Sequence, residues 1–246
     1  MARKYERPPI VEAICEFKFD PESRWDLTIP GLLYENLKYE FPNKGSNLIM
    51  GFNIAASPEE IKQNVEKIEL AQFKHQNKPL LVQVGQHILT INHLAPYSNW
   101  ENFIVVIEKA YNAYKQVANP SAFQRIGVRY INRIDIPRDK FRFKLFTFGP
   151  KFWSPVPQPN SVLSFITGVE LPFEGNRDRM KLQLATAQTT QTDMRSFILD
   201  IDYYLTDPSL IGFDDAIKWV NDAHKSVEKA FEDSISDKLR EQFGAG

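Results

Sequence analysis

The alternation of apolar and polar positions is clearest between Arg125 and Pro137. One set of alternate positions carries Arg125, Arg129 and Arg133, whereas the other set is mostly apolar. A period of two is typical of a β-strand, in which successive side chains point to opposite faces. The pattern therefore predicts a strand with one largely apolar face and one arginine-bearing face, and Pro137 ends it.

Similar patterns predict the other elements of the first half. Ser57 and Glu60 have the spacing of a capping box, with Pro58 at the first helical position, so we expect a short helix that fades near Lys67. A second capping box, Ser98 to Glu101, precedes a helical stripe of apolar residues. The other predicted elements are strands at 10–19, 48–54, 69–75, 79–84 and 87–92, and helices at 30–41 and 100–114.

The second half is predicted to contain longer strands, a proline-rich loop and a long helix. A strand is predicted at 141–148, followed by a loop at 150–160 that contains four prolines. Three long strands are predicted at 161–172, 179–190 and 195–206, and their short connections imply an antiparallel meander. A single long amphipathic helix is predicted at 213–243.

These elements define an α+β fold class. We expect curved antiparallel sheets, arranged as two interlocked halves or as one unit, packed against two or three long helices. Each half is too thin to close a core alone, so residues 1–246 are predicted to form a single α+β unit, with 1–140 and 141–246 as the alternative halves.

Composition narrows the class of protein. The 30 basic and 31 acidic residues leave a net charge of -1, which argues against a dedicated nucleic-acid coat and against membrane-surface binding. Cys15 is the single cysteine, so no intrachain disulfide forms, as in proteins of reducing compartments. No apolar run reaches signal-peptide or membrane-spanning length, and we expect a cytoplasmic protein.

The arginine-bearing face is the main candidate site. Arginine on a sheet face either binds an anionic ligand or pairs with carboxylates of neighbouring strands. Both interpretations stay open, because carboxylates occur at the same two-residue spacing on two other predicted strands. The candidate binding residues are Arg125, Arg129, Arg133, Glu12, Glu16, Asp200 and Asp202.

Motifs for catalysis and for metal or cofactor binding are missing from the sequence. The sequence contains no zinc-ligand spacing, nucleophile elbow, phosphate-binding glycine loop or dinucleotide fingerprint, so we assign no catalytic residue, metal site or cofactor. Aromatic residues gather before and within the proline-rich loop. Among them, Phe152 and Trp153 are candidate interface residues, with a loop held in place by aromatic packing as the structural alternative.

Several segments together carry a family resemblance: Pro8-Pro9-Ile10-Val11-Glu12-Ala13, Tyr97-Ser98-Asn99-Trp100-Glu101, Arg125 to Ile134, and Leu199-Asp200-Ile201-Asp202. In their order and spacing, the chain resembles a sporadically distributed bacterial family of proteins of about this length, to which no activity is assigned. The resemblance implies one shared architecture and a bacterial cytoplasmic location. It transfers no mechanism. Sporadic distribution is loosely associated with mobile or defence-linked genes.

The functional expectation is a non-enzymatic binding or interaction module that self-associates as a homodimer or pairs with another protein. The alternative is a ligand-sensing or enzymatic protein with an anion-binding arginine–carboxylate pocket. A further alternative is a nucleic-acid-binding component of a defence or toxin–antitoxin system, although the net charge does not indicate it. Whether the protein is an enzyme stays open.

Overall fold

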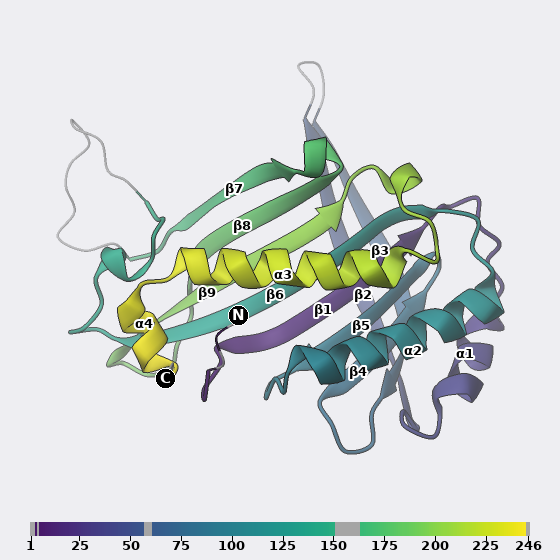
Figure 1. Ribbon diagram of the computed structural model, residues 1–246, viewed down its shortest axis with the longest axis horizontal. Helices are drawn as coiled ribbons and strands as arrows, with labels where there is room; N and C mark the ends of the chain where they lie inside the picture. The colour runs from purple at the N-terminus through teal and green to yellow at the C-terminus, as the bar shows by residue number, and fades with distance from the viewer. Residues whose placement is uncertain (1–2, 4, 57–60, 151–162, 245–246) are drawn as a thin grey trace. The chain divides into compact units, whose positions relative to one another are not determined.

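A computed structural model describes residue 3 and residues 5–56, 61–150 and 163–244, with the backbone alone at 49–56 and 61–68. The described chain forms an antiparallel sheet and four α-helices, which confirms the predicted α+β class (Figure 1). The strands are β1 (Ile10–Phe19), β2 (Asn43–Ala56), β3 (Ile61–Lys74), β4 (Leu80–Gly85), β5 (Ile88–Leu94), β6 (Phe123–Pro137), β7 (Ile166–Phe173), β8 (Asp178–Ala187) and β9 (Met194–Leu205). The helices are α1 (Ile29–Leu37), α2 (Trp100–Ala118), α3 (Ala216–Ser234) and α4 (Asp237–Gln242).

Two compact units make up the chain. Unit 1 comprises residues 1–14, 95–97 and 127–246, and unit 2 comprises 15–94 and 98–126. The strands are hydrogen-bonded in the order β2-β3-β4-β5-β1-β6-β9-β8-β7, and both β1 and β6 contribute residues to each unit. In unit 1, β7, β8 and β9 are consecutive antiparallel neighbours, so the meander predicted for the second half is confirmed.

Aromatic packing fills the core of unit 2. Alternate residues of β1 are buried, and two of them stack on α2: Phe17 on Tyr111 with ring centroids 4.7 Å apart, and Phe19 on Tyr114 at 4.6 Å. A helical spacing of three places Tyr111 and Tyr114 on the same side of α2. The period of two in the strand and the helical period in α2 therefore meet in one buried layer.

Unit 1 is built in the same way from β9 and α3. The alternate β9 residues Leu199, Ile201 and Tyr203 are buried, and α3 lies across this face of the strand (Figure 1). Tyr203 contacts Trp219 of α3, with ring centroids 5.9 Å apart. This arrangement fixes which face of α3 meets the sheet, and it places the end of β9 beside the first turns of the helix.

The predicted short helix that fades near Lys67 is wrong over residues 61–67, which belong to strand β3. Residues 57–60, which carry the capping signal, lie outside the described residues. Strand β3 pairs with β2 from Ile61, opposite Ala56, to Lys74, opposite Asn43. A capping box is a local signal, and pairing along fourteen residues overrides it.

Two other expectations need correction in unit 1. The strand predicted at 141–148 is instead a 3-10 turn at Phe143–Leu145, and the predicted terminal helix is divided into α3 and α4 at Ile235. The division of the helix has a cause in backbone pairing. Ile235 is extended and forms a β-bridge with Phe146, and the flanking amide of Thr147 donates to the Ser234 carbonyl. Backbone pairing between the two segments interrupts the helix at this point.

The stacked aromatic layer of unit 2 predicts the cost of removing one ring. Phe19→Ala should lower the free energy of unfolding by about 3–5 kcal/mol, because it deletes a fully buried ring that contacts Tyr114 and Phe123. Val105→Ala on the exposed side of α2 is the control and should change it by less than about 0.5 kcal/mol. Urea denaturation measures both, and equal effects would contradict the assigned core.

Candidate functional site

The arginine-bearing face of β6 is largely ion-paired. Arg129 donates from Nε and Nη2 to the two carboxylate oxygens of Asp200 on β9, at 2.8 and 2.5 Å. This bidentate bond is the main cause that raises the pKa of Arg129, and the charges of Asp202 and Glu12 add to it. Unit 1 therefore brings together four of the predicted site residues, Arg129, Asp200, Asp202 and Glu12.

The other two arginines also have partners. Arg133 contacts Asp135 on its own strand at 3.2 Å and donates to the hydroxyl of Ser196 at 3.0 Å. Arg125 belongs to unit 2, where it forms an ion pair of 2.5 Å with Glu16 of β1. Ion pairing of this kind satisfies the charge of a sheet face without any ligand.

The predicted interface residues Phe152 and Trp153 lie outside the described residues. Aromatics that precede them in the chain are packed. Phe141 stacks on Phe197 at 4.9 Å and Phe143 contacts Phe165 at 5.8 Å. These contacts place the start of the aromatic-rich segment against the sheet of unit 1.

A second arginine–carboxylate cluster lies where β8 begins. Asp178 has no exposed surface, and four hydrogen bonds reach its carboxylate. Arg177 donates to both oxygens, from Nε at 3.1 Å and Nη2 at 2.6 Å, while Tyr203 donates at 3.0 Å and Trp219 at 3.1 Å. An ionised carboxylate is acceptor-only and can use four such donors, so the buried charge is fully satisfied.

The turn before β8 produces this geometry. Glu174, Gly175 and Asn176 have φ values of 48°, 65° and 75°, in the left-handed region, so the chain reverses within three residues. Glycine and asparagine adopt this conformation at low cost. The reversal pairs Phe173 with Asp178 at the start of β8, and the adjacent Arg177 forms the bidentate pair with Asp178.

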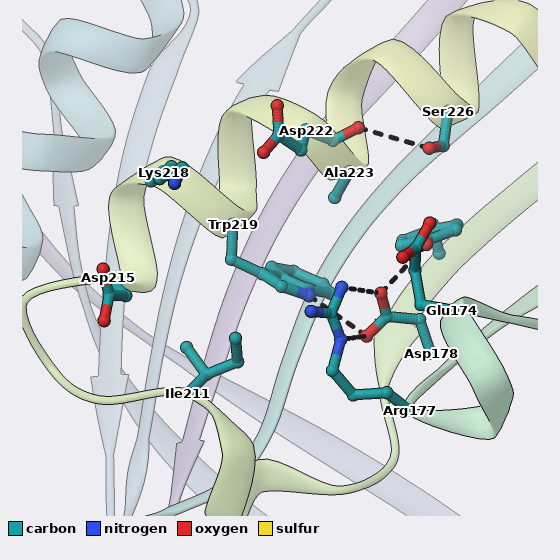
Figure 2. A pocket seen from close by; sticks show the side chains of 11 residues that line it. Glu174, Arg177, Asp178, Ile211, Asp215, Lys218, Trp219, Asp222, Ala223 and Ser226 are labelled. Carbon is teal, nitrogen blue, oxygen red and sulfur yellow. Dashed lines mark hydrogen bonds and ion pairs between the residues drawn. The ribbon is translucent and has the colours of Figure 1, made fainter.

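The cluster opens into a pocket of about 360 Å³ in unit 1. Figure 2 shows Asp178 and Arg177 reaching toward Trp219, with residues of the first turns of α3 on the other side. The lining is contributed by the turn, β8, β9, the segment between β9 and α3, and α3 itself. It comprises Glu174, Arg177, Asp178, Tyr203, Ile211, Asp215, Lys218, Trp219, Asp222, Ala223 and Ser226.

Helical spacing explains what α3 contributes to the pocket. Trp219 and Ala223 are buried against the sheet, whereas Asp215, Lys218 and Asp222 follow the exposed edge of the same helix at intervals of three and four. The pocket therefore has an aromatic and ionic floor and a charged rim.

Electrostatics of the floor are set by the Arg177–Asp178 pair. Its hydrogen bonds raise the pKa of Arg177, which stays cationic. Burial raises the pKa of Tyr203, and the charge of Asp178 raises it further, so the hydroxyl remains a donor. Arg177 therefore stays cationic and Tyr203 stays neutral throughout the physiological pH range.

Sequence patterns did not single out Asp178 or Trp219. A usable signal was present, because Asp178 is in phase with Met180 and Leu184 on the buried face of β8. A carboxylate at an apolar-face position requires a buried partner. Its partner in α3, Trp219, is far along the chain, and no spacing rule predicts the pairing of the two residues.

The part of the chain that the structure describes holds no cluster of three or more histidine, cysteine, aspartate or glutamate side chains suited to a metal ion. Within those same residues, no helix has the length and apolar character needed to cross a membrane.

Comparison with models of known protein families finds no match for this chain, and comparison with curated proteins finds none either.

The Asp178 cluster predicts a large stability effect. Asp178→Ala should lower the free energy of unfolding by about 3–5 kcal/mol, because it leaves the buried donors of Tyr203 and Trp219, and the half-buried guanidinium of Arg177, without their acceptor. Asp193→Ala, a change at an exposed acidic residue in the turn before β9, is the control and should cost less than about 0.5 kcal/mol. Urea denaturation measures both variants, and similar losses of stability would contradict the role of the buried Asp178 cluster.

Proposed function

We propose that the protein is a non-enzymatic binding module whose Asp178 pocket holds a small zwitterion, such as a free amino acid. The observation that carries the proposal is an arginine fixed by a buried carboxylate at the floor of a pocket with charged groups of both signs at its rim. This combines the binding-module expectation with an arginine–carboxylate pocket, at residues other than those of the β6 face.

Arg177 supplies the contact for the anionic end of the ligand. Its Nε and Nη2 atoms are held by Asp178, and Nη1 donates to no acceptor among the described residues. A guanidinium fixed on one side and open on the other is a preorganised donor for a carboxylate. Lys218, exposed at the rim, adds a second positive charge near the same pocket.

The rim also favours a positive group on the ligand. Asp178 cancels the charge of Arg177, and Lys225 outside the lining pairs with Asp222 at 2.8 Å, so the remaining charges are Glu174 and Asp215 against Lys218 alone. A simple anion would meet an excess of negative charge, whereas a zwitterion can place its carboxylate at Arg177 and its ammonium group at the acidic residues. Charge balance therefore favours the zwitterion.

The size of the pocket agrees with a small molecule. Ligand pockets typically enclose about 300–1,000 Å³, and this one lies at the lower end with about 360 Å³. Ile211 and Ala223 provide apolar lining for a short side chain. Specificity among amino acids would then depend on the side chain that fits between these residues.

Isothermal titration with the proteinogenic amino acids, and with inorganic phosphate as a simple anion, tests the proposal. At least one amino acid should bind, and phosphate should bind more weakly. Lys218→Ala and Asp215→Asn should each weaken that binding by about tenfold, because each removes one charge-assisted contact. Neither change should unfold the protein, since both residues are exposed and the side chain of Asp215 makes no helix-capping bond.

The matched control is Lys229→Ala. This lysine lies on the same helix, is exposed, and is outside the pocket lining, so its removal should leave the affinity unchanged. Absence of binding by the whole panel, or equal losses for Lys218→Ala and Lys229→Ala, would contradict the proposed site.

A further inference from the structure

Strand β7 is the last strand in the order on the unit 1 side, and several of its apolar side chains are exposed. Ile166 is 75% exposed, Val169 48% and Leu171 43%. No described strand pairs with its outer edge. An exposed edge of this kind presents unpaired backbone groups that can accept another strand.

The pairing with β8 identifies which backbone groups face outward. The amide of Thr186 donates to the carbonyl of Phe165, so Phe165 and every second residue after it direct their backbone groups toward β8. In an antiparallel ladder the intervening residues direct theirs to the other side. The free edge therefore offers the amides of Ile166, Gly168 and Glu170.

We propose that two copies of this chain associate by antiparallel pairing of β7 with β7 about a two-fold axis at Val169. The side chains that share a face with Val169 read Phe165, Thr167, Val169, Leu171 and Phe173, an order that is nearly the same in both directions. Centring the axis on Val169 sets Phe165 opposite Phe173 and Thr167 opposite Leu171. The edge is thus complementary to itself, which is the requirement for a two-fold interface.

Charge placement also favours a second copy. Glu170 is the only charged residue of β7, and this register sets it opposite Gly168 of the other copy rather than opposite its own equivalent. Within its own chain, Glu170 already accepts hydrogen bonds from Arg179 at 3.1 Å and from Tyr204 at 2.6 Å. Like charges are therefore not brought directly together across the axis.

Cysteine cross-linking tests the register directly. Residues opposite each other at a non-hydrogen-bonded position have Cα atoms about 4.5 Å apart, within the range of about 4.4–6.8 Å that a disulfide requires. Val169→Cys should therefore give a disulfide-linked dimer under mild oxidation. Leu171→Cys is the matched control, because it has similar exposure but faces Thr167 of the other copy and should not cross-link to itself.

A mixture of Thr167→Cys and Leu171→Cys proteins should cross-link as a heterodimer, as the proposed register requires. The native cysteine does not interfere, because Cys15 is fully buried and burial raises the pKa of its thiol. Equal self-cross-linking of the Val169→Cys and Leu171→Cys proteins would overturn the register.

Association without any cross-link is measured by sedimentation velocity. A protein concentration of about 100 μM is used, because a contact smaller than the standard interface associates weakly. The unmodified chain should dimerise, Val169→Lys and Val169→Glu should each be monomeric, and their mixture should dimerise again. A monomeric unmodified chain, or a dimer that Val169→Lys leaves intact, would overturn the proposal. Val105→Lys, at an exposed apolar residue of α2, controls for a general effect of added charge.

Discussion

The buried carboxylate of Asp178 is the constraint on which unit 1 depends. A charge without exposed surface is tolerated only when its hydrogen bonds are complete, and here the donors come from its neighbour in the chain, from β9 and from α3. Because Trp219 must reach Asp178, the first turns of α3 are held at the start of β8. The pocket exists because these elements converge on one charged group.

The same ionic chemistry has a different consequence on the β6 face. Arg129 and Asp200 form a bidentate pair as well, but the arginine side chain is 43% exposed and the pair stands on an open strand surface. Partial exposure screens the interaction and limits its contribution to stability. The Arg177–Asp178 pair is buried on its carboxylate side and faces a pocket on the other, so burial distinguishes a surface ion pair from a candidate ligand site.

Sequence periodicity predicted most strands and the helices α1 and α2, because those elements have regular apolar patterns that local rules describe. Its errors occurred where backbone pairing between segments overrides the local pattern, as at β3 and at Ile235. The ion pair of Arg129 with Asp200 could be predicted from the sequence, since both residues lie on strands with clear alternation. The Asp178 pocket could not be predicted in this way, because its position depends on the packing of Trp219, which no spacing in the sequence specifies.

The indole N–H of Trp219 offers the most direct measurement of the central claim. It donates to Asp178 and lines the pocket, so its proton–nitrogen NMR signal should shift when the bound amino acid is added. The chain has four tryptophans, and the signal is assigned by its loss in Trp219→Phe. A saturable shift of this signal, weakened by Lys218→Ala, is the predicted result. A Trp219 signal that stays fixed throughout the amino acid panel would contradict the proposed binding site.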